Sequence, residues 1–236
     1  MPTSTAPVAI VTAAGSGIGC GMAAALAASG YSVSLFDIDP GVENLAVELG
    51  GLATVGSLTD LDDLARLVDA TIERYGRIDA VVNGGGHARN NDLLSVTDGE
   101  WHDGLDMLLL SVVRMARLVT PHMEAAGKGA FVNLSSYTAF EPMAEIPVNS
   151  TMRAALTSFT KLYADGHAAK GIRMNNLMPG FVDSWPEDPR FLAKIPAGRY
   201  ATTAEIGKLA RFLVSDDASY INGESIRIDG GAARSL

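Results

Sequence analysis

The chain has 236 residues, of which 47% are hydrophobic and 19% are charged, and its formal net charge is −9. This composition excludes a disordered chain, and an acidic balance without any basic run argues against nucleic acid or an anionic membrane surface as a partner. Short patterns rich in β-branched residues predict strands, in chain order, at 8–14, 31–38, 52–58, 78–85, 129–136, 172–179 and 224–229. Longer helical patterns lie at 18–29, 41–49, 60–75, 98–126, 148–169 and 203–214.

This alternation predicts a single α/β domain over 1–236, a Rossmann-type, doubly wound parallel sheet of about seven strands in three α/β/α layers. Several strands are apolar almost throughout, as in a parallel sheet covered on both faces. One irregular segment, 181–203, contains three prolines and follows a strand end. We expect this segment to be a substrate lid, and the alternative is an ordinary surface loop.

The sequence also predicts where the protein resides. The opening stretch "MPTSTAPVAIVTAAG" has no basic residue before its apolar run, so we do not expect a secretory signal. No apolar run reaches the roughly 18 residues that a membrane helix needs. Cys20 is the only cysteine, which leaves no intrachain disulfide and no thiolate cluster for a metal. We expect a cytoplasmic protein without a metal site.

A glycine-rich turn joins the first predicted strand to the first helix. Gly15, Gly17 and Gly19 permit a tight turn and close approach of a ligand, and the free N–H groups of the following helix suit a pyrophosphate. Cys20 stands where the G-x-G-x-x-G fingerprint has its last glycine. Asp37 ends the second strand 18 residues after Gly19, where a carboxylate binds ribose hydroxyls and repels the 2′-phosphate of NADP. The predicted cofactor is therefore NAD.

From Val8 to Gly231 the chain resembles the short-chain dehydrogenase/reductase family. The motifs that carry the resemblance are "TAAGSGIG" (12–19), with Ala13 in place of the first glycine, "VVNGGG" (81–86), "VNLSS" (132–136), "RMNNLMPGFVDS" (173–184) and "INGESIRIDGG" (221–231). The resemblance implies an NAD-dependent oxidoreductase acting on a small secondary alcohol or ketone. The cofactor-binding positions that it implies are Thr12, Gly15, Gly17, Ile18, Gly19, Asp37, Leu58, Asn83, Gly84, Arg153, Pro179, Gly180, Val182 and Ser184.

The catalytic positions of that family are largely replaced here. Ser136 matches the serine that polarises the substrate carbonyl, but Asn149 stands at the tyrosine position and Arg153 at the lysine position. Leu108 falls where the family has the asparagine of its proton relay. Asn has no ionisable proton, and Arg stays protonated at any working pH. The usual acid–base pair is therefore absent.

Other residues are candidates for the missing proton donor. His87 follows the "NGGG" stretch and has a pKa class suited to proton transfer. Tyr137 follows Ser136 directly, and Glu141 and Glu145 lie between Ser136 and Asn149. Arg153 is also a feature of the halohydrin dehalogenases, which resemble this family but keep the tyrosine and lack the dinucleotide loop.

Two functions remain open at this point. The first is an oxidoreductase with a non-standard proton donor. The second is a non-catalytic subunit or NAD-responsive binding protein that pairs with an active homologue. The resemblance implies a homotetramer formed through 98–126 and 148–169, where the small residues Ala154, Ala155 and Ser158 permit close approach of helices; a hetero-oligomer is the alternative.

Overall fold

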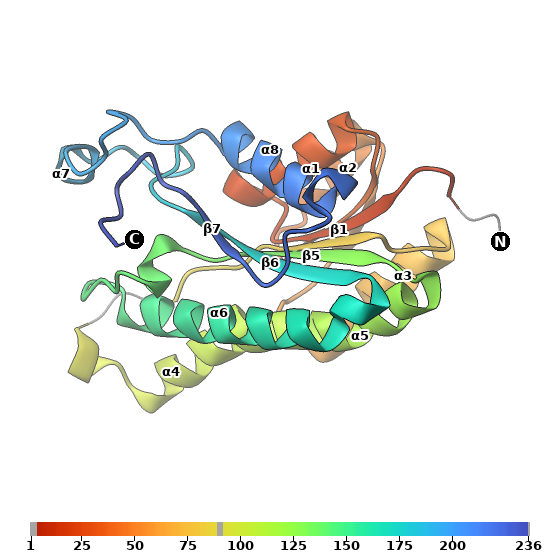
Figure 1. Ribbon diagram of the computed structural model, residues 1–236, viewed down its shortest axis with the longest axis horizontal. Coiled ribbons are helices and arrows are strands. Elements are labelled where there is room, and N and C mark those ends of the chain that lie inside the picture. The colour runs from red at the N-terminus through yellow and green to blue at the C-terminus, as the bar shows by residue number, and fades with distance from the viewer. Residues whose placement is uncertain (1–3, 89–91, 236) are drawn as a thin grey trace.

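The computed structural model describes residues 4–88 and 92–235. Its centre is a seven-stranded parallel sheet in the order β3-β2-β1-β4-β5-β6-β7 (Figure 1). The strands are β1 (Val8–Thr12), β2 (Ser32–Asp37), β3 (Leu52–Val55), β4 (Ala80–Asn83), β5 (Gly129–Leu134), β6 (Ile172–Pro179) and β7 (Ser225–Ile228). All seven predicted strands are confirmed, most of them shorter at one or both ends than predicted.

Helices cover both faces of the sheet, which confirms the three-layer fold. On one face lie α1 (Gly17–Ala28), α2 (Val42–Leu49) and α8 (Thr203–Val214), and on the other lie α3 (Leu61–Tyr75), α5 (Ser111–Ala126) and α6 (Pro147–His167) (Figure 1). Each face has its own apolar core, because alternate strand residues point to opposite faces. Val11 and Leu35 belong to one core, and Ile10 and Phe36 to the other.

Local sequence signals explain where helices begin and end. The Asp60 side chain accepts hydrogen bonds from the backbone N–H groups of Asp62 and Asp63, and so caps the start of α3. Gly76 ends that helix with φ of 73°, a left-handed conformation that glycine adopts without strain. The strand order reverses between β1 and β4, and ligands bind such sheets at the carboxyl ends of strands at this switch point.

The segment predicted as one helix at 98–126 has three parts. These are α4 (Asp98–Leu105), a π-helical turn (Asp106–Leu110) and α5. The Ser111 hydroxyl donates to the Met107 carbonyl at 2.7 Å within this stretch. Apolar periodicity does not distinguish a π-turn from an α-turn, so the sequence did not predict it. Such turns occur often at functional sites, and this one contains Leu108.

The segment 181–203, which is called the lid below after its expected role only, is folded rather than irregular. It contains the short helix α7 (Pro189–Leu192), and the Phe181 ring stacks on Phe191 with centroids 4.8 Å apart. The Tyr200 hydroxyl accepts from the Asp188 backbone N–H at 3.1 Å. The remaining short helical turns are the 3-10 helices Leu93–Ser95, Tyr137–Ala139, Ala168–Lys170 and Asp216–Ala218.

A row of polar side chains crosses the buried sheet. Asn83, Asn133, Asn176 and Ser225 are neighbours in strand register from β4 to β7. The Asn83 amide donates to Asn133 Oδ1 at 2.8 Å, Asn133 donates to Thr160 Oγ1 at 3.0 Å, and Asn176 donates to Ser225 Oγ at 3.0 Å. Buried polar groups are stable only when paired in this way. The row therefore fixes the carboxyl ends of β4 and β5, where the site lies.

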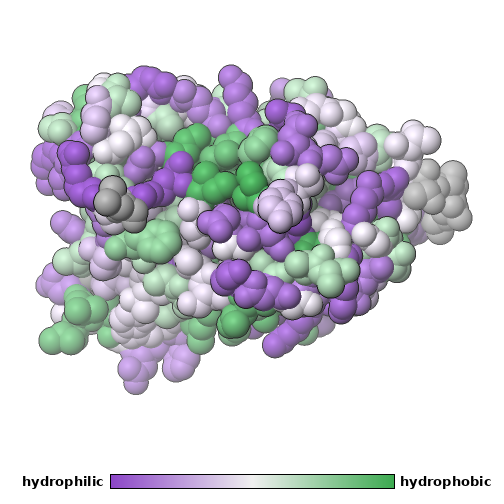
Figure 2. Space-filling view, viewed as in Figure 1, coloured by the Kyte–Doolittle hydropathy of each residue, from purple (hydrophilic) through white to green (hydrophobic). Residues whose placement is uncertain are grey.

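The surface seen in Figure 2 is mainly hydrophilic, with a group of hydrophobic residues in the region of α8. Within the part of the chain that the structure describes, no helix is both long and apolar enough to cross a membrane.

Candidate functional site

Asp37 and the glycine turn form one hydrogen-bonded unit at the carboxyl ends of β1 and β2. Asp37 Oδ2 accepts from the Gly15 backbone N–H at 2.8 Å, and Oδ1 accepts from the Asp39 N–H at 2.9 Å. A carboxylate oxygen has a further lone pair after each of these bonds. Asp37 is thus fixed in orientation and can still accept hydrogen bonds from a diol.

The turn itself has backbone positions that only small residues tolerate. A Cβ on Gly19 would lie 1.8 Å from the Ala13 carbonyl oxygen, and Gly17 has φ of +52°. Ala13, which we expected at the position of the family's first glycine, also has a positive φ, 50°, which costs an L-residue roughly 1–2 kcal/mol. The backbone therefore adopts a glycine-like conformation at a residue that is not glycine.

A cavity of about 510 Å³ lies beside this turn. It is lined by residues from the turn, the ends of β2, β3 and β4, and the lid: Ala13, Ser16, Gly17, Ile18, Gly19, Asp37, Ile38, Gly56, Ser57, Leu58, Thr59, Gly84, Gly85, Gly86, His87, Met107, Leu134, Ser184 and Trp185. Besides Asp37, six of the predicted cofactor-binding residues therefore line this cavity: Gly17, Ile18, Gly19, Leu58, Gly84 and Ser184. Trp185 and Met107 were not predicted, and the only sequence signal for Trp185 is its place directly after Ser184.

The remaining predicted cofactor-binding residues do not line the cavity. The Thr12 hydroxyl donates to the Gly84 carbonyl at 3.1 Å, which ties the end of β1 to the end of β4. Asn83 belongs to the buried polar row, and Val182 pairs with Ala201 at the base of the lid. Gly180 packs against Asp229, where a Cβ would lie 2.9 Å from its Cα. Together with Pro179, which ends β6, these residues position the cavity walls.

The buried hydroxyl of Ser184 bears on whether the cavity suits a dinucleotide. Ser184 Oγ and Ser135 Oγ are the buried side-chain oxygens that have no hydrogen-bond partner among the described residues. Buried polar atoms are nearly always paired, and Ser184 lines the cavity next to Gly17. A ligand amide or hydroxyl at this point satisfies the Ser184 hydroxyl. The glycine turn, Asp37 and Ser184 therefore fit an extended dinucleotide.

Asn149 is used to hold a loop. Its amide nitrogen donates to the Ala88 carbonyl at 3.2 Å, and its amide oxygen accepts from the Ala88 N–H at 3.4 Å. Both polar atoms of the buried side chain thus bind one residue of the stretch after β4. Asn149, the residue that we expected at the tyrosine position, therefore fixes the backbone next to His87.

Arg153 is a buried cation without an acidic partner among the described residues. Its side chain is 6% exposed, and Nη1 donates to the Leu134 carbonyl. Burial lowers the pKa of Arg153 to about 10, so the guanidinium stays charged at neutral pH. A Cβ on Gly85 would lie 3.4 Å from Nη2, which places the charge directly behind the cavity wall.

His87 lies at the cavity rim on the loop that Asn149 holds. Its ring meets Trp185 of the lid edge to face, with centroids 5.2 Å apart. The side chain is exposed, yet partial desolvation and then the charge of Arg153 lower the pKa of His87 below 6.5. His87 is therefore mostly neutral at pH 7 and can accept a proton beside the cofactor cavity.

The other candidate proton donors are placed differently. Tyr137 lines a separate hollow of about 430 Å³, and its hydroxyl donates to Met143 Sδ at 3.2 Å. Burial, and then Glu141, Asp229 and Glu145, raise the pKa of Tyr137. Glu141 also lines that hollow, and its carboxylate accepts from the backbone N–H groups of Ser235 and Arg234, which lowers its pKa. Glu145 is exposed at the surface.

Ser136 and Leu108 complete the comparison with the family pattern. Ser136 Oγ accepts from the Thr138 backbone and hydroxyl at 3.2 and 3.0 Å, which leaves its own proton free to donate. Ser136 follows the cavity residue Leu134 by two positions but does not itself line the cavity. Leu108 is buried in the π-turn, so no polar group from that position reaches the site.

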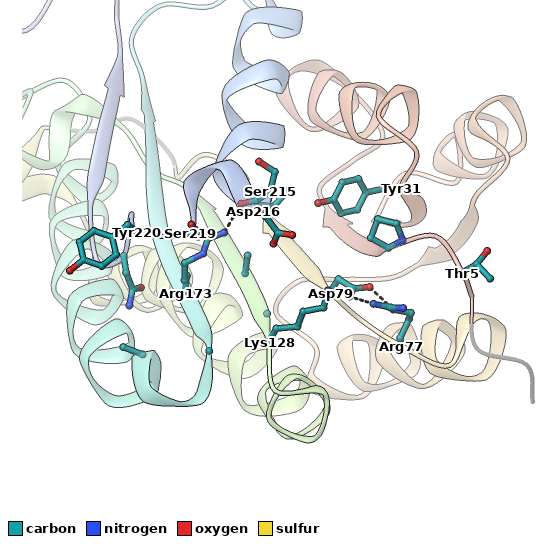
Figure 3. Close-up of a pocket in the computed structure, with 17 residues that line it drawn as sticks. Thr5, Tyr31, Arg77, Asp79, Lys128, Arg173, Ser215, Asp216, Ser219 and Tyr220 are labelled. Carbon is teal, nitrogen blue, oxygen red and sulfur yellow. Dashed lines mark hydrogen bonds and ion pairs between the residues drawn. The ribbon is translucent and has the colours of Figure 1, made fainter.

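A larger hollow, of about 1030 Å³, lies at the opposite edge of the sheet, around the amino ends of the strands. Figure 3 shows that two of its charged side chains, Arg77 and Arg173, already have partners. Arg77 bonds Asp79, with Nε to Oδ2 at 2.8 Å, and Arg173 donates to the Leu213, Ser215 and Ile221 carbonyls. None of the predicted site residues lines this hollow.

Comparison with known proteins agrees with this geometry. Residues 12–233 match a family model described as enoyl-(acyl carrier protein) reductase. The chain is 31% identical over 237 residues to 3-oxoacyl-(acyl-carrier-protein) reductase FabG of Thermotoga maritima, covering 95% of this chain and 96% of that protein. It is 35% identical over 251 residues to oxidoreductase UcpA of Escherichia coli, with 97% and 95% coverage.

Solved structures share the fold. L-sorbose reductase from Gluconobacter frateurii, complexed with NADPH and L-sorbose, superposes with a TM-score of 0.89 at 24% identity, covering 99% of both chains. YwfH, described as an NADPH-dependent reductase, has a TM-score of 0.93 at 22% identity, covering 98% of this chain and 100% of that one. The family match and the two curated relatives together establish that this chain is an oxidoreductase-type member of the short-chain dehydrogenase/reductase family, which binds a nicotinamide cofactor.

Proposed function

We propose that this protein is an NAD-dependent oxidoreductase that interconverts a secondary alcohol and a ketone, with His87 exchanging the proton in place of the family's tyrosine. The observation that carries the proposal is that His87 lines the same cavity as the glycine turn and Asp37. Asn149 has no ionisable proton and both its polar atoms are bound to Ala88.

We propose NAD rather than NADP because of the charged side chains that line the cavity. Asp37 presents a carboxylate where a 2′-phosphate of NADP would lie, and none of the described cavity-lining residues is Lys or Arg. Arg66, which bonds the Val55 carbonyl next to the end of β2, is already paired with Asp63. Both similar solved structures are described with NADPH, so cofactor preference is a point on which this chain differs from them.

Each residue has a defined task in the proposed reaction. The nicotinamide supplies hydride acceptance and donation when bound. Asp37 would bind the ribose hydroxyls, the N–H groups at the start of α1 would bind the pyrophosphate, and Ser184 would pair its hydroxyl with a polar group of the cofactor. In alcohol oxidation, neutral His87 accepts the hydroxyl proton and passes it to solvent at the cavity rim. Ser136, whose proton is free, lies two positions beyond the cavity residue Leu134 and would donate a hydrogen bond to a substrate oxygen that extends past the cavity.

Two further features belong to this proposal. We propose a cytoplasmic location because Cys20 is a free thiol. We propose a homo-oligomer because α6 exposes a stripe of small and apolar residues. The competing function is a binding subunit of an active homologue, with a retained cofactor cavity and no turnover.

Calorimetry and a turnover assay test the proposal together. We expect NAD to bind at least tenfold more tightly than NADP, and NAD-saturated protein to oxidise members of a panel of secondary alcohols. Equal affinity for the two cofactors would contradict the role of Asp37. NAD binding without turnover of any alcohol or ketone in the panel would favour the binding subunit.

A further inference from the structure

The segment 229–235, which follows β7, is held by hydrogen bonds to other parts of the fold. Figure 1 shows it, in blue, on the side of the molecule that carries α7. The Ala197 N–H of the lid donates to the Gly230 carbonyl at 3.1 Å. Arg227 of β7 donates through Nη1 to Ser235 Oγ at 3.1 Å. The segment is therefore anchored to the lid at one end and to the sheet at the other.

Glu141 ties the same segment to the loop that precedes α6. Its carboxylate accepts hydrogen bonds from the backbone N–H groups of Arg234 and Ser235, which lie 93 and 94 positions away in sequence. A hydrogen bond to an ionised group is roughly twice as strong as one between neutral groups. One side chain thus connects two surface segments that are distant in sequence.

Glu141 also belongs to the hydrogen-bonded turn that begins at Ser136. The Glu141 N–H donates to the Tyr137 carbonyl at 3.1 Å, and the Ala139 N–H donates to the Ser136 carbonyl at 3.1 Å. Ser136 Oγ accepts from the Thr138 N–H at 3.2 Å. An anchor at Glu141 therefore acts on the same turn that orients the Ser136 hydroxyl.

The turn, the lid and the segment 229–235 surround the hollow of about 430 Å³. Tyr137 lines this hollow, whereas Leu134 lines the cofactor cavity, so Ser136 lies between the two spaces along the chain. Loss of the bonds to Glu141 would free one wall of the hollow and one support of the turn together.

We infer that Glu141 is a positioning residue: it fastens the segment 229–235 to the turn and so holds Ser136 where its hydroxyl meets the substrate oxygen. The inference rests on the proposed function for the role of Ser136. Glu141 does not line the cofactor cavity, and it acts through the turn. Its task is to accept two hydrogen bonds, which the amide oxygen of a glutamine also does.

Hydrogen exchange tests the contact without any need for activity. Mass spectrometry follows deuterium uptake in peptides that cover 134–141 and 229–236 of the unmodified protein and of Glu141→Ala. We expect the Arg234 and Ser235 amides to exchange roughly 10-fold faster in the variant, because they lose their acceptor. The Thr138 and Ala139 amides should exchange faster as well, because the turn loses its anchor.

Steady-state kinetics test the positioning of Ser136. With a secondary alcohol that the protein oxidises, Glu141→Ala should lower kcat/KM roughly 2- to 10-fold. The dissociation constant for NAD should not change, since the cofactor cavity is separate. Glu141→Gln should restore most of the slow exchange and most of kcat/KM. Glu145→Ala, an exposed change in the same loop, is the matched control and should alter neither.

Three outcomes overturn the inference. One is unchanged exchange of both peptides in Glu141→Ala. Another is faster exchange with an unchanged kcat/KM, which would mean that the contact positions nothing used in the reaction. The third is an equal loss of NAD affinity and kcat/KM, which would indicate a general structural role. Faster exchange that Glu141→Gln reverses, in a protein without turnover, would contradict the proposed reaction and leave the anchoring of the Ser136 turn standing.

Discussion

At the scale of single residues, Asn149 organises the loop that carries His87. Its side chain, which we expect at the family's tyrosine position, binds Ala88 across 61 positions of sequence. The sequence was sufficient to predict that Asn149 cannot act as an acid or base, since that follows from its chemistry. It was not sufficient to predict the bond to Ala88, because that bond depends on the path of the loop after β4.

Removing the Asn149 amide should loosen the loop that carries His87. We expect Asn149→Ala to lower the free energy of unfolding by about 1–2 kcal/mol. This is a small loss for two hydrogen bonds, because the two bonds to Ala88 are long. We also expect slower turnover, since His87 adjoins the released residue. Urea denaturation and steady-state rates measure the two effects. Asn44→Ala, the same substitution at an exposed position of α2, is the control; equal behaviour of the two variants would show that the Ala88 contact does not hold the loop.

At the scale of elements, the sequence predicted the seven strands and the six long helical segments, because short β-branched apolar runs and a helical period of 3.6 are strong signals. It missed the π-turn at Asp106–Leu110 and the folded interior of the lid. These features depend on contacts such as Ser111 with Met107 and Phe181 with Phe191, which periodicity does not encode. It also missed the polar row, since a strand residue's cross-sheet neighbour is set by register.

The polar row should matter for both stability and cofactor binding. Asn133→Leu keeps the branched shape, adds some volume, and leaves the Asn83 amide and the Asn176 oxygen with fewer partners, so we expect a loss of about 2–4 kcal/mol. NAD affinity should fall as well, because Asn83 adjoins the cavity residue Gly84. Chemical denaturation and calorimetry measure these losses. The exposed change Asn44→Ala should shift stability by at most about 0.5 kcal/mol, and a similarly small effect of Asn133→Leu would argue against the row.

At the scale of the whole molecule, α6 exposes Ala154, Ser158 and Leu162 at four-residue spacing, and Leu162 is 73% exposed. We expect this stripe to lie in a subunit interface, because small residues let helices approach closely and an exposed leucine gains from burial. Light scattering should give the mass of a tetramer of 24.6 kDa chains, and Leu162→Glu should give a smaller species. A monomer of the unmodified protein at micromolar concentration would contradict this, and stable binding to an active homologue would favour the hetero-oligomer.

The two halves of the site differ in how far the sequence could predict them. The cofactor half follows a local pattern of glycines and a strand-end aspartate, and the structure places most of those residues around one cavity. The proposed catalytic half combines residues from the loop after β4, from α6 and from segment 181–203, which are far apart in sequence. His87, Tyr137 and the two glutamates were all candidates from sequence, and His87 alone of them lines the cofactor cavity.

The pH dependence of alcohol oxidation is the most direct test of the claim that His87 exchanges the proton. Desolvation and the charge of Arg153 lower the pKa of His87 below 6.5, and the neutral form is the base. The rate of NAD-dependent oxidation should therefore be constant near pH 7.5 and fall as pH decreases, with an apparent pKa below 6.5. His87→Ala should reduce the rate by about 10²- to 10⁴-fold and abolish this fall, whereas His122→Ala, an exposed change on α5, should preserve both rate and profile. An unchanged rate and profile in His87→Ala would contradict the account.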